Sequence, residues 1–211
     1  MADSPDRNQY DSLTHRTRLA LGDAAVTALS RARMIVVGLG GVGSWCAEAL
    51  ARSGVLDLTL VDPDTVCATN VNRQAQATAL NTGEPKAIEM EKRLLAISPT
   101  ASITPITGSY REETRAHFDL ASYDCVIDAI DSIDDKLLLI RDCLRAETAI
   151  FSSMGAAMKT DPGRIRAGLL TQATGCPLAR LVRKGLRRDG VGTDIMCVYS
   201  DEPPLQSPAP D

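Results

Sequence analysis

Residues 34–43 read Met-Ile-Val-Val-Gly-Leu-Gly-Gly-Val-Gly, and this stretch decides the fold. Its four leading apolar residues are typical of a short buried strand, and four glycines then fill six positions. An alanine-rich run from Ser44 to Ser53 follows and predicts a helix. A strand that ends in glycines and opens into a helix forms a phosphate cradle, because glycine permits a sharp turn and the helix N-terminus directs free N–H groups at an anion. We therefore expect a nucleotide to lie against Gly38, Gly40, Gly41 and Gly43.

An acidic residue follows the next predicted strand. Residues 56–61 are mostly apolar and end at Asp62-Pro63-Asp64. Asp62 lies about 20 residues beyond the glycines, which is where a nucleotide-binding sheet places the acid that holds a ribose hydroxyl. The spacing predicts a Rossmann-type nucleotide site that includes Asp62.

The composition indicates one globular domain with short appendages. The chain has 211 residues, 44% of them apolar, which is enough for a sizeable core. Its formal net charge of −4 neither favours nor excludes nucleic acid, so an RNA contact would need a local basic patch. Six scattered cysteines without a C-x-x-C pair argue against structural zinc and against a secreted disulfide framework. Without a signal peptide or an apolar run of about 18 residues, the chain is expected to be cytoplasmic.

The rest of the pattern alternates strands with helices. Further strands are predicted at 101–105, 123–131, 149–153, 165–170 and 194–200, and further helices at 24–33, 83–97, 111–117, 132–145 and 176–188. This alternation predicts an α/β fold with a mostly parallel sheet and helices on both faces, and a ligand beyond the carboxyl ends of the strands. We expect residues 1–12 to be disordered, 13–201 to form the domain, and the proline-rich tail 202–211 to be disordered.

Several polar residues outside the glycine loop suit a phosphate ligand. Lys86 falls in the first turn of a predicted helix, where a cation is unfavourable unless an anion lies nearby. Asp131, Asp134 and Asp135 follow a strand and could hold a hydrated Mg²⁺ beside phosphates, and helix capping by Asp131 or Ser132 is an alternative that is compatible with the metal role. Each of these residues alone could be a solvated surface charge, and the argument rests on their meeting at one edge of the sheet.

Five motifs together resemble the ThiF/MoeB superfamily of adenylyltransferases, which is related to ubiquitin-activating enzyme. They are Gly-Leu-Gly-Gly-Val-Gly (38–43), Val-Asp-Pro-Asp (61–64), Asn-Val-Asn-Arg-Gln (70–74), Gly-Glu-Pro-Lys (83–86) and Asp-Ala-Ile-Asp-Ser (128–132). Three further stretches resemble its branch of tRNA threonylcarbamoyladenosine dehydratases (TcdA/CsdL), namely 16–23, 152–156 and 174–183. The resemblance covers roughly residues 12 to 203.

The resemblance implies an ATP-dependent enzyme that cyclises threonylcarbamoyladenosine in tRNA to a hydantoin through an acyl-adenylate. It implies that the glycine loop cradles phosphates, that Asp62 and Asp64 belong to the nucleotide site, and that Asn70 and Gln74 orient the nucleotide. Arg73 and Lys86 would stabilise charge on the phosphates, and Asp131 would bind Mg²⁺. It further implies a homodimer in which Arg16 reaches into the partner's ATP site, and some relatives act with a sulfur-acceptor protein.

Two features differ from the superfamily pattern. The zinc-binding cysteine pairs of MoeB-like members are absent, which favours the dehydratase branch. Members of that branch continue into a further apolar segment, sometimes membrane-associated, so we expect a C-terminally shortened form. Cys176 and Cys197 match the positions of nucleophilic cysteines in some members, but neither lies in a setting that would activate it.

Three other functions remain open at this stage. The chain could activate the C-terminus of a ubiquitin-like or sulfur-carrier protein, although the missing zinc pairs argue against it. It could be an NAD-dependent oxidoreductase, which would leave Arg73, Lys86 and Asp131 without a role. It could also be a non-catalytic nucleotide-binding scaffold, which the shortened C-terminus keeps open.

A basic segment at 180–188 is the best candidate for an RNA contact. On a helix, Arg180, Arg183, Lys184 and Arg187 would fall largely on one face, which could meet several phosphates. The alternative is a solvated helix face with no partner.

Overall fold

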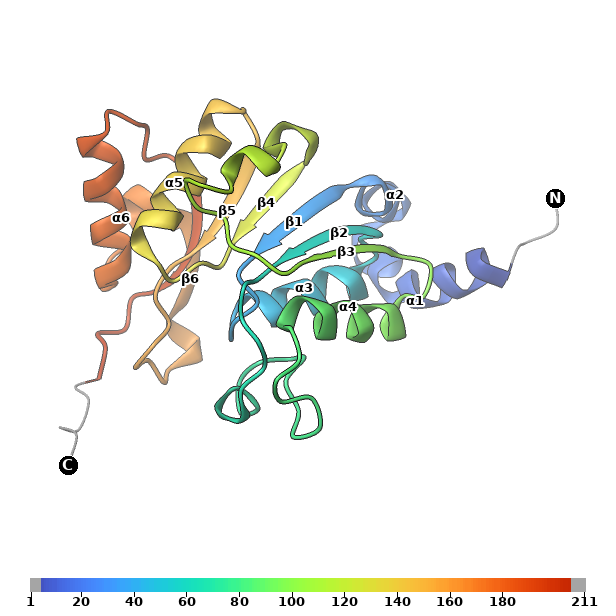
Figure 1. Ribbon diagram of the computed structural model, residues 1–211. Helices are drawn as coiled ribbons and strands as arrows, with labels where there is room; N and C mark the ends of the chain where they lie inside the picture. The colour runs from blue at the N-terminus through green and yellow to red at the C-terminus, as the bar shows by residue number, and fades with distance from the viewer. Residues whose placement is uncertain (1–4, 206–211) are drawn as a thin grey trace.

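The computed structural model describes residues 5–205, which form one α/β domain around a seven-stranded sheet (Figure 1). The strands lie in the order β3-β2-β1-β4-β5-β7-β6. All neighbouring strands are parallel except for the edge strand β6, which pairs antiparallel with β7. The strands are β1 Arg33–Val37, β2 Asp57–Val61, β3 Ser102–Ile106, β4 Cys125–Asp128, β5 Ala149–Ser153, β6 Ile165–Leu169 and β7 Met196–Ser200. The helices are α1 Pro5–Leu21, α2 Asp23–Arg31, α3 Gly43–Ser53, α4 Lys86–Ile97, α5 Ile133–Arg145 and α6 Pro177–Arg188. The predicted fold class is confirmed.

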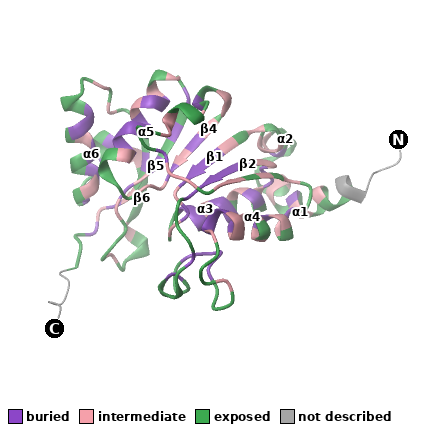
Figure 2. Ribbon diagram, viewed as in Figure 1, coloured by how far each residue is buried: buried purple, intermediate pink, exposed green. Residues whose placement is uncertain are grey.

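The strand order reverses at β1. The chain winds from β1 outward through β2 to β3, then returns to β4 on the other side of β1. The glycine loop and the turn after β4 therefore flank the same gap at the carboxyl ends of the strands, which is where open α/β sheets bind ligands. The central strand is sealed on both faces, and Ile35, Val36 and Val37 are each at most 2% exposed (Figure 2).

Helices cover the two faces of the sheet unequally. Helices α3 and α4 pack on one face of β1 and β2, while α5 and α6 pack on the opposite face over β4, β5 and β7 (Figure 1). The register places Phe151 of β5 on the same face as Val36 of β1 and beside Met196 of β7. Phe151, Met196 and Val198 are all at least 36% exposed, so within the described chain this part of the α3 face has no helix over it.

The N-terminal segment differs from the expected disorder. Residues 5–12 belong to α1, while residues 1–4 lie outside the described part. Tyr10 donates a hydrogen bond from its hydroxyl to the Gly54 carbonyl at 3.0 Å, and Thr14 is fully buried. Gly54 adopts φ 107° at the end of α3, and a Cβ there would approach both side chains to 2.8 Å. Glycine at this position thus ends α3 and makes room for α1, which anchors a segment whose composition is polar.

The start of the tail is also held in place. Glu202 is 8% exposed, and its carboxylate accepts hydrogen bonds from the backbone N–H groups of Thr160 and Asp161. These bonds lower the pKa of the Glu202 carboxyl. The expected disorder therefore does not begin at residue 202, and residues 206–211 lie outside the described part of the chain.

The predicted helix at 111–117 shrinks to a short 3-10 turn at Arg115–His117. Thr114 donates from its hydroxyl to the Ser109 carbonyl at 2.6 Å and accepts from the Arg111 N–H at 3.1 Å. A threonine that bonds local backbone groups in this way competes with helix formation. Among the described helices, none is long and apolar enough to cross a bilayer.

Candidate active site

A cavity of about 710 Å³ opens beyond the carboxyl ends of the strands, at the point where the strand order reverses. It brings together most of the residues singled out from the sequence. Those that line it are Gly38, Gly40, Gly41, Asp62, Asp64, Asn70, Arg73, Gln74, Lys86 and Asp131. We call Gly38, Gly40, Gly41, Asp62, Asp64, Asn70, Arg73, Gln74 and Lys86 the phosphate side. We call Asp131, Asp135, residues 153–157 and Leu178, which also line the cavity, the acceptor side.

The glycine loop turns too tightly for any other residue at two positions. Gly38 has φ 94°, and a Cβ there would lie 2.6 Å from the Ala129 carbonyl oxygen. A Cβ at Gly43 would lie 1.8 Å from the Gly38 carbonyl oxygen. Gly43 is the first residue of α3 and does not line the cavity, so it shapes the turn. The N-terminus of α3 therefore starts directly at the loop, as an anion site requires.

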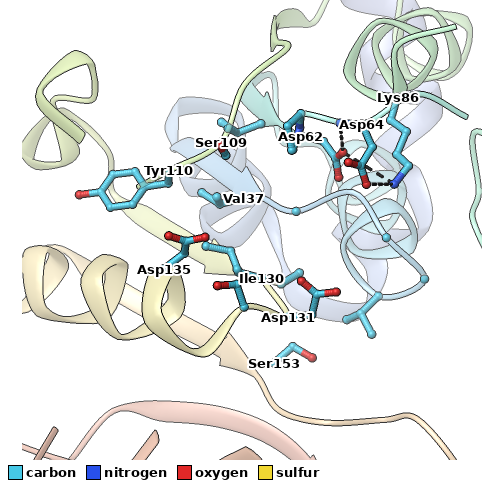
Figure 3. A pocket seen from close by; sticks show the side chains of 18 of the residues that line it. Val37, Asp62, Asp64, Lys86, Ser109, Tyr110, Ile130, Asp131, Asp135 and Ser153 are labelled. Atoms are coloured by element: carbon cyan, nitrogen blue, oxygen red, sulfur yellow. Dashed lines mark hydrogen bonds and ion pairs between the residues drawn. The ribbon is translucent and has the colours of Figure 1, made fainter. Parts of the chain in front are cut away.

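Asp62 joins the loop to the end of β2. It is 5% exposed, and its carboxylate accepts from the Leu39 N–H at 2.6 Å and from the Asp64 N–H at 2.9 Å. Lys86 is also buried, with its ammonium nitrogen 2.7 Å from Asp64 Oδ2 and 3.8 Å from Asp62 Oδ1 (Figure 3). Two carboxylates therefore compensate a lysine at a helix N-terminus, where it would otherwise be unfavourable.

The 67–74 segment closes the same side of the cavity. Arg73 is exposed, and its guanidinium donates to the Thr69 carbonyl at 2.7 Å. Asn70 is 7% exposed and accepts the Cys67 N–H on its side-chain oxygen at 2.9 Å. The indole of Trp45 donates to the Arg73 carbonyl at 2.9 Å, which ties the segment to α3. Arg73 thus carries a charge at the cavity, while Asn70 has a structural task in the turn.

The predicted cluster of three acids does not form. Asp131 and Asp135 line the cavity from the acceptor side, but Asp134 does not (Figure 3). Successive residues at the start of α5 point in different directions, so Asp134 and Asp135 cannot face one ligand. Within residues 5–205, no three His, Cys, Asp or Glu side chains gather closely enough to hold a metal ion.

Arg16 is not at the cavity of its own chain. It is exposed on α1, the helix whose Tyr10 and Thr14 contact Gly54 at the C-terminal end of α3. The glycine loop lies at the opposite end of α3, about 16 Å away for an 11-residue helix. Arg16 therefore does not contribute to the cavity of its own chain.

The cysteines are free thiols, and the two positional candidates are buried. Burial raises the pKa of Cys197 to about 11, which disfavours its thiolate. Cys176 caps α6, accepting the Ala179 N–H on sulfur at 3.5 Å. Cys67 is exposed, and a hydrogen bond from Thr69 lowers its pKa, but it does not line the cavity. Leaving Cys176 and Cys197 out of the catalytic residues agrees with this geometry.

The basic face of α6 differs from its prediction at one residue. Arg183 is half-buried and donates to the Leu170 carbonyl at 2.8 Å and to the Ala173 carbonyl, so it holds the preceding turn in place. Arg180, Lys184 and Arg187 remain exposed at helical spacing. Helix α6 reaches the cavity through Leu178, and none of these three cations lines it.

The sequence did not reveal two pairs of buried polar side chains next to the cavity. Lys136 and Asp128 form an ion pair at 2.7 Å with both side chains fully buried. Tyr110 lines the cavity and donates from its hydroxyl to Asp142 at 2.7 Å, and burial raises the pKa of Tyr110. A lysine inside the run Lys-Leu-Leu-Leu-Ile at 136–140 was the available signal, since the apolar face of a helix rarely carries an unpaired charge.

The doubly wound sheet, the glycine loop at a helix N-terminus and the charged cavity define a nucleotide-binding α/β protein. The ThiF family profile matches residues 14–190, and the chain belongs to this family. A tRNA threonylcarbamoyladenosine dehydratase of Bacillus subtilis is 41% identical over 190 residues, which are 90% of this chain and 75% of that protein. The Escherichia coli protein of the same name is 39% identical over 188 residues, covering 86% of this chain and 70% of that one.

A solved structure supports the same relationship. The crystal structure of E. coli tRNA N6-threonylcarbamoyladenosine dehydratase, TcdA, in complex with ATP superposes with a TM-score of 0.90 at 34% identity. The superposition covers 97% of this chain and 86% of that chain. The resemblance stated from the motifs is confirmed.

Proposed function

We propose that this protein is an ATP-dependent tRNA threonylcarbamoyladenosine dehydratase. The observation that carries the proposal is the match of nearly the whole chain to dehydratases of that name, with the charged residues of one cavity in the positions that ATP chemistry needs. The reaction closes the threonylcarbamoyl side chain of the modified adenosine into a hydantoin ring.

The chemistry consists of two displacements. An oxygen of the threonine carboxylate attacks the α-phosphorus of ATP, and pyrophosphate leaves with the electrons of the broken P–O bond. A nitrogen of the same side chain then attacks the activated carbonyl carbon, and AMP leaves with the carboxylate oxygen. A proton is lost from the attacking nitrogen. The tRNA therefore loses one water overall, and its oxygen ends on AMP.

Residues of the phosphate side account for the first step. The N–H groups of the glycine loop and the start of α3 suit the phosphates of ATP, and Asp62 suits the ribose. Lys86 and Arg73 line the cavity, and their charge suits the stabilisation of charge that builds on the α-phosphate and on pyrophosphate. Asn70 and Gln74, both buried at the cavity wall, suit the orientation of the nucleotide. Asp64 already pairs with Lys86 and would hold its ammonium at the cavity.

Mg²⁺ fits the acceptor side only together with the nucleotide. Asp131 and Asp135 offer two carboxylates at the cavity, and Mg²⁺ in such sites is held by one or two carboxylates, waters and phosphates. The ion would neutralise phosphate charge. Asp131, which lies at the end of the β4 turn, is the residue we assign to it.

We further propose a homodimer with Arg16 acting across the interface. Arg16 is exposed and remote from its own cavity, and the face formed by Phe151, Met196 and Val198 is apolar and uncovered in the described chain. Exposed apolar surface of this kind marks association sites. A second copy that covers this face would remove it from water and could carry an arginine to the neighbouring site.

The tRNA would contact the row Arg180, Lys184 and Arg187. These cations are exposed at helical spacing on α6, and phosphate contacts of this kind supply most of the non-specific affinity for nucleic acid. This assignment replaces the one that included Arg183. A cytoplasmic location and a sulfur-acceptor partner stay predictions.

The proposal is tested with the purified protein, ATP, Mg²⁺ and tRNA that carries threonylcarbamoyladenosine. We expect stoichiometric AMP and pyrophosphate, together with a modified nucleoside whose mass has fallen by one water. The control is the same tRNA without the modification, which should give no AMP. Turnover with the unmodified tRNA, or ATP binding without any AMP formed from the modified one, would point to carrier activation or to a scaffold instead.

A further inference from the structure

A fully buried ion pair lies directly beneath the cavity. Lys136 of α5 and Asp128 of β4 are both 0% exposed. The Lys136 ammonium donates to Asp128 Oδ2 at 2.7 Å, to the Ser153 carbonyl at 3.0 Å and to the Ser152 hydroxyl at 3.5 Å. The Ser152 hydroxyl in turn donates to Asp128 Oδ2. All three ammonium protons thus have acceptors.

Stability does not explain why these charges are buried. Removing two charges from water costs several kcal/mol for each ion, and well-packed apolar residues in place of such a pair are often as stable or more stable. The reason for the pair therefore lies in what it holds.

The pair holds two neighbouring turns of the acceptor side. Asp128 Oδ1 accepts the Ile130 N–H at 3.0 Å, one residue before Asp131. Lys136 binds the carbonyl of Ser153, where the segment 153–157 begins to line the cavity. Figure 3 shows Ile130, Asp131 and Ser153 on this side of the cavity. One salt bridge therefore connects the turn that carries Asp131 with the turn that faces it.

We propose that Asp128 and Lys136 are positioning residues, which fix Asp131 relative to the segment 153–157. The catalytic consequence rests on the function proposed above. A group that must meet phosphates in one geometry loses rate when it shifts by a fraction of an ångström, and a misplacement of 1 Å can cost about 100-fold.

The test uses the double variant Asp128→Asn with Lys136→Met. Lys136→Met alone would leave a buried unpaired carboxylate and could fail to fold, whereas the double variant has no buried charge. Asparagine also keeps an oxygen that can accept the Ile130 N–H. The matched control is Glu48→Gln, since Glu48 is 6% exposed and binds Arg52 and Arg93 between α3 and α4, away from the cavity.

We expect the double variant to lower kcat by about 10- to 100-fold, with KM for ATP close to wild type. The control should keep the wild-type kcat at a similar loss of thermal stability. In an Asp131→Ala background, the double substitution should lower kcat much less than in the wild type, because both act through the same carboxylate. Equal losses in the two backgrounds, or an unchanged kcat in the folded double variant, would overturn the proposal.

Hydrogen exchange in the ligand-free protein gives a readout that does not need turnover. We expect faster exchange at residues 129–135 and 152–157 in the double variant, with no change there in Glu48→Gln. Unchanged exchange in both segments would overturn the proposal even if activity fell. If the wild type fails to convert tRNA, the proposed function fails, and the exchange measurement still decides whether the pair holds the two turns.

Discussion

The two sides of the cavity each rely on a lysine near the start of a helix, and the two lysines differ in what can reach them. Lys86 pairs with Asp64, whose side chain is 64% exposed, whereas Lys136 pairs with Asp128 in full isolation from solvent. A ligand phosphate can replace or join an exposed carboxylate, but it cannot reach a sealed pair. The Lys86 pair therefore offers its charge to chemistry, whereas the Lys136 pair uses its charge to hold the backbone.

The difference between Lys86 and Lys136 should be largest in their effect on folding stability. Lys136→Met should lower the free energy of unfolding by about 3–5 kcal/mol, because it leaves a carboxylate buried without a partner. Lys86→Met should lower it far less, because Asp64 can turn to water. Urea unfolding followed by circular dichroism measures both variants. Equal losses in the free energy of unfolding would mean that the two lysines contribute equally to stability, and this would contradict the contrast.

The loss of turnover should be larger for Lys86 than for Lys136, which is the reverse of the order expected for stability. Lys86→Ala and Arg73→Ala should still bind ATP but lose about 100- to 1,000-fold in kcat, since each removes a contact to charge that develops in the transition state. Lys92→Ala is the matched control, because Lys92 is an exposed lysine on the same helix and pairs with Glu89. AMP formation measures the rates, and wild-type turnover in both site variants would remove the phosphate side from the chemistry.

Complementation tests the trans role of Arg16. Arg16→Ala and Asp131→Ala proteins should each be nearly inactive, and a mixture should regain part of the activity because one hybrid site carries both native residues. Subunit exchange in the mixture is checked first by mass spectrometry of the intact complex. A mixture that exchanges subunits and stays inactive would exclude an Arg16 contribution across the interface.

The smallest expected effect concerns the exposed basic row of α6 and its contact with RNA. Arg180→Glu with Arg187→Glu should weaken tRNA binding and flatten its salt dependence by about one unit of slope for each lost phosphate contact. ATP affinity should not change, because both residues are outside the cavity lining. Filter binding across a salt titration measures the slope for the double variant and for each single variant, with Arg166→Glu on β6 as the charge-matched control for the single variants. Identical slopes for wild type and variant would place the RNA surface elsewhere.

The same division of the cavity explains what the sequence could reveal. Glycines between a strand and a helix, and acids at fixed distances after strands, are signals of local geometry, so the phosphate side could be predicted nearly residue by residue. On the acceptor side, Asp131 could be predicted from its place after a strand, and the stretches 152–156 and 174–183 stood out only through the resemblance. Residues 153–157 and Leu178 carry no charge, so their place at the cavity could not be predicted from local chemistry. Arg183 resembled its exposed neighbours because helical spacing does not show which cation meets a carbonyl.

Two further differences between the predicted and the observed structure also arise from long-range contacts. The polar composition of residues 5–12 gave no sign of α1, whose Tyr10 is held by a carbonyl 44 residues away. Glu202 looked like the start of a proline-rich tail, yet it binds backbone N–H groups about 40 residues earlier in the chain.

The central claim, activation of the threonine carboxylate by adenylation, is tested most directly by following oxygen. The tRNA is prepared with heavy oxygen in the carboxylate of its threonylcarbamoyl group and converted in a single turnover. The account predicts that one labelled oxygen appears in the phosphate of AMP. Label in orthophosphate or pyrophosphate, or a cyclised product with unlabelled AMP, would contradict it.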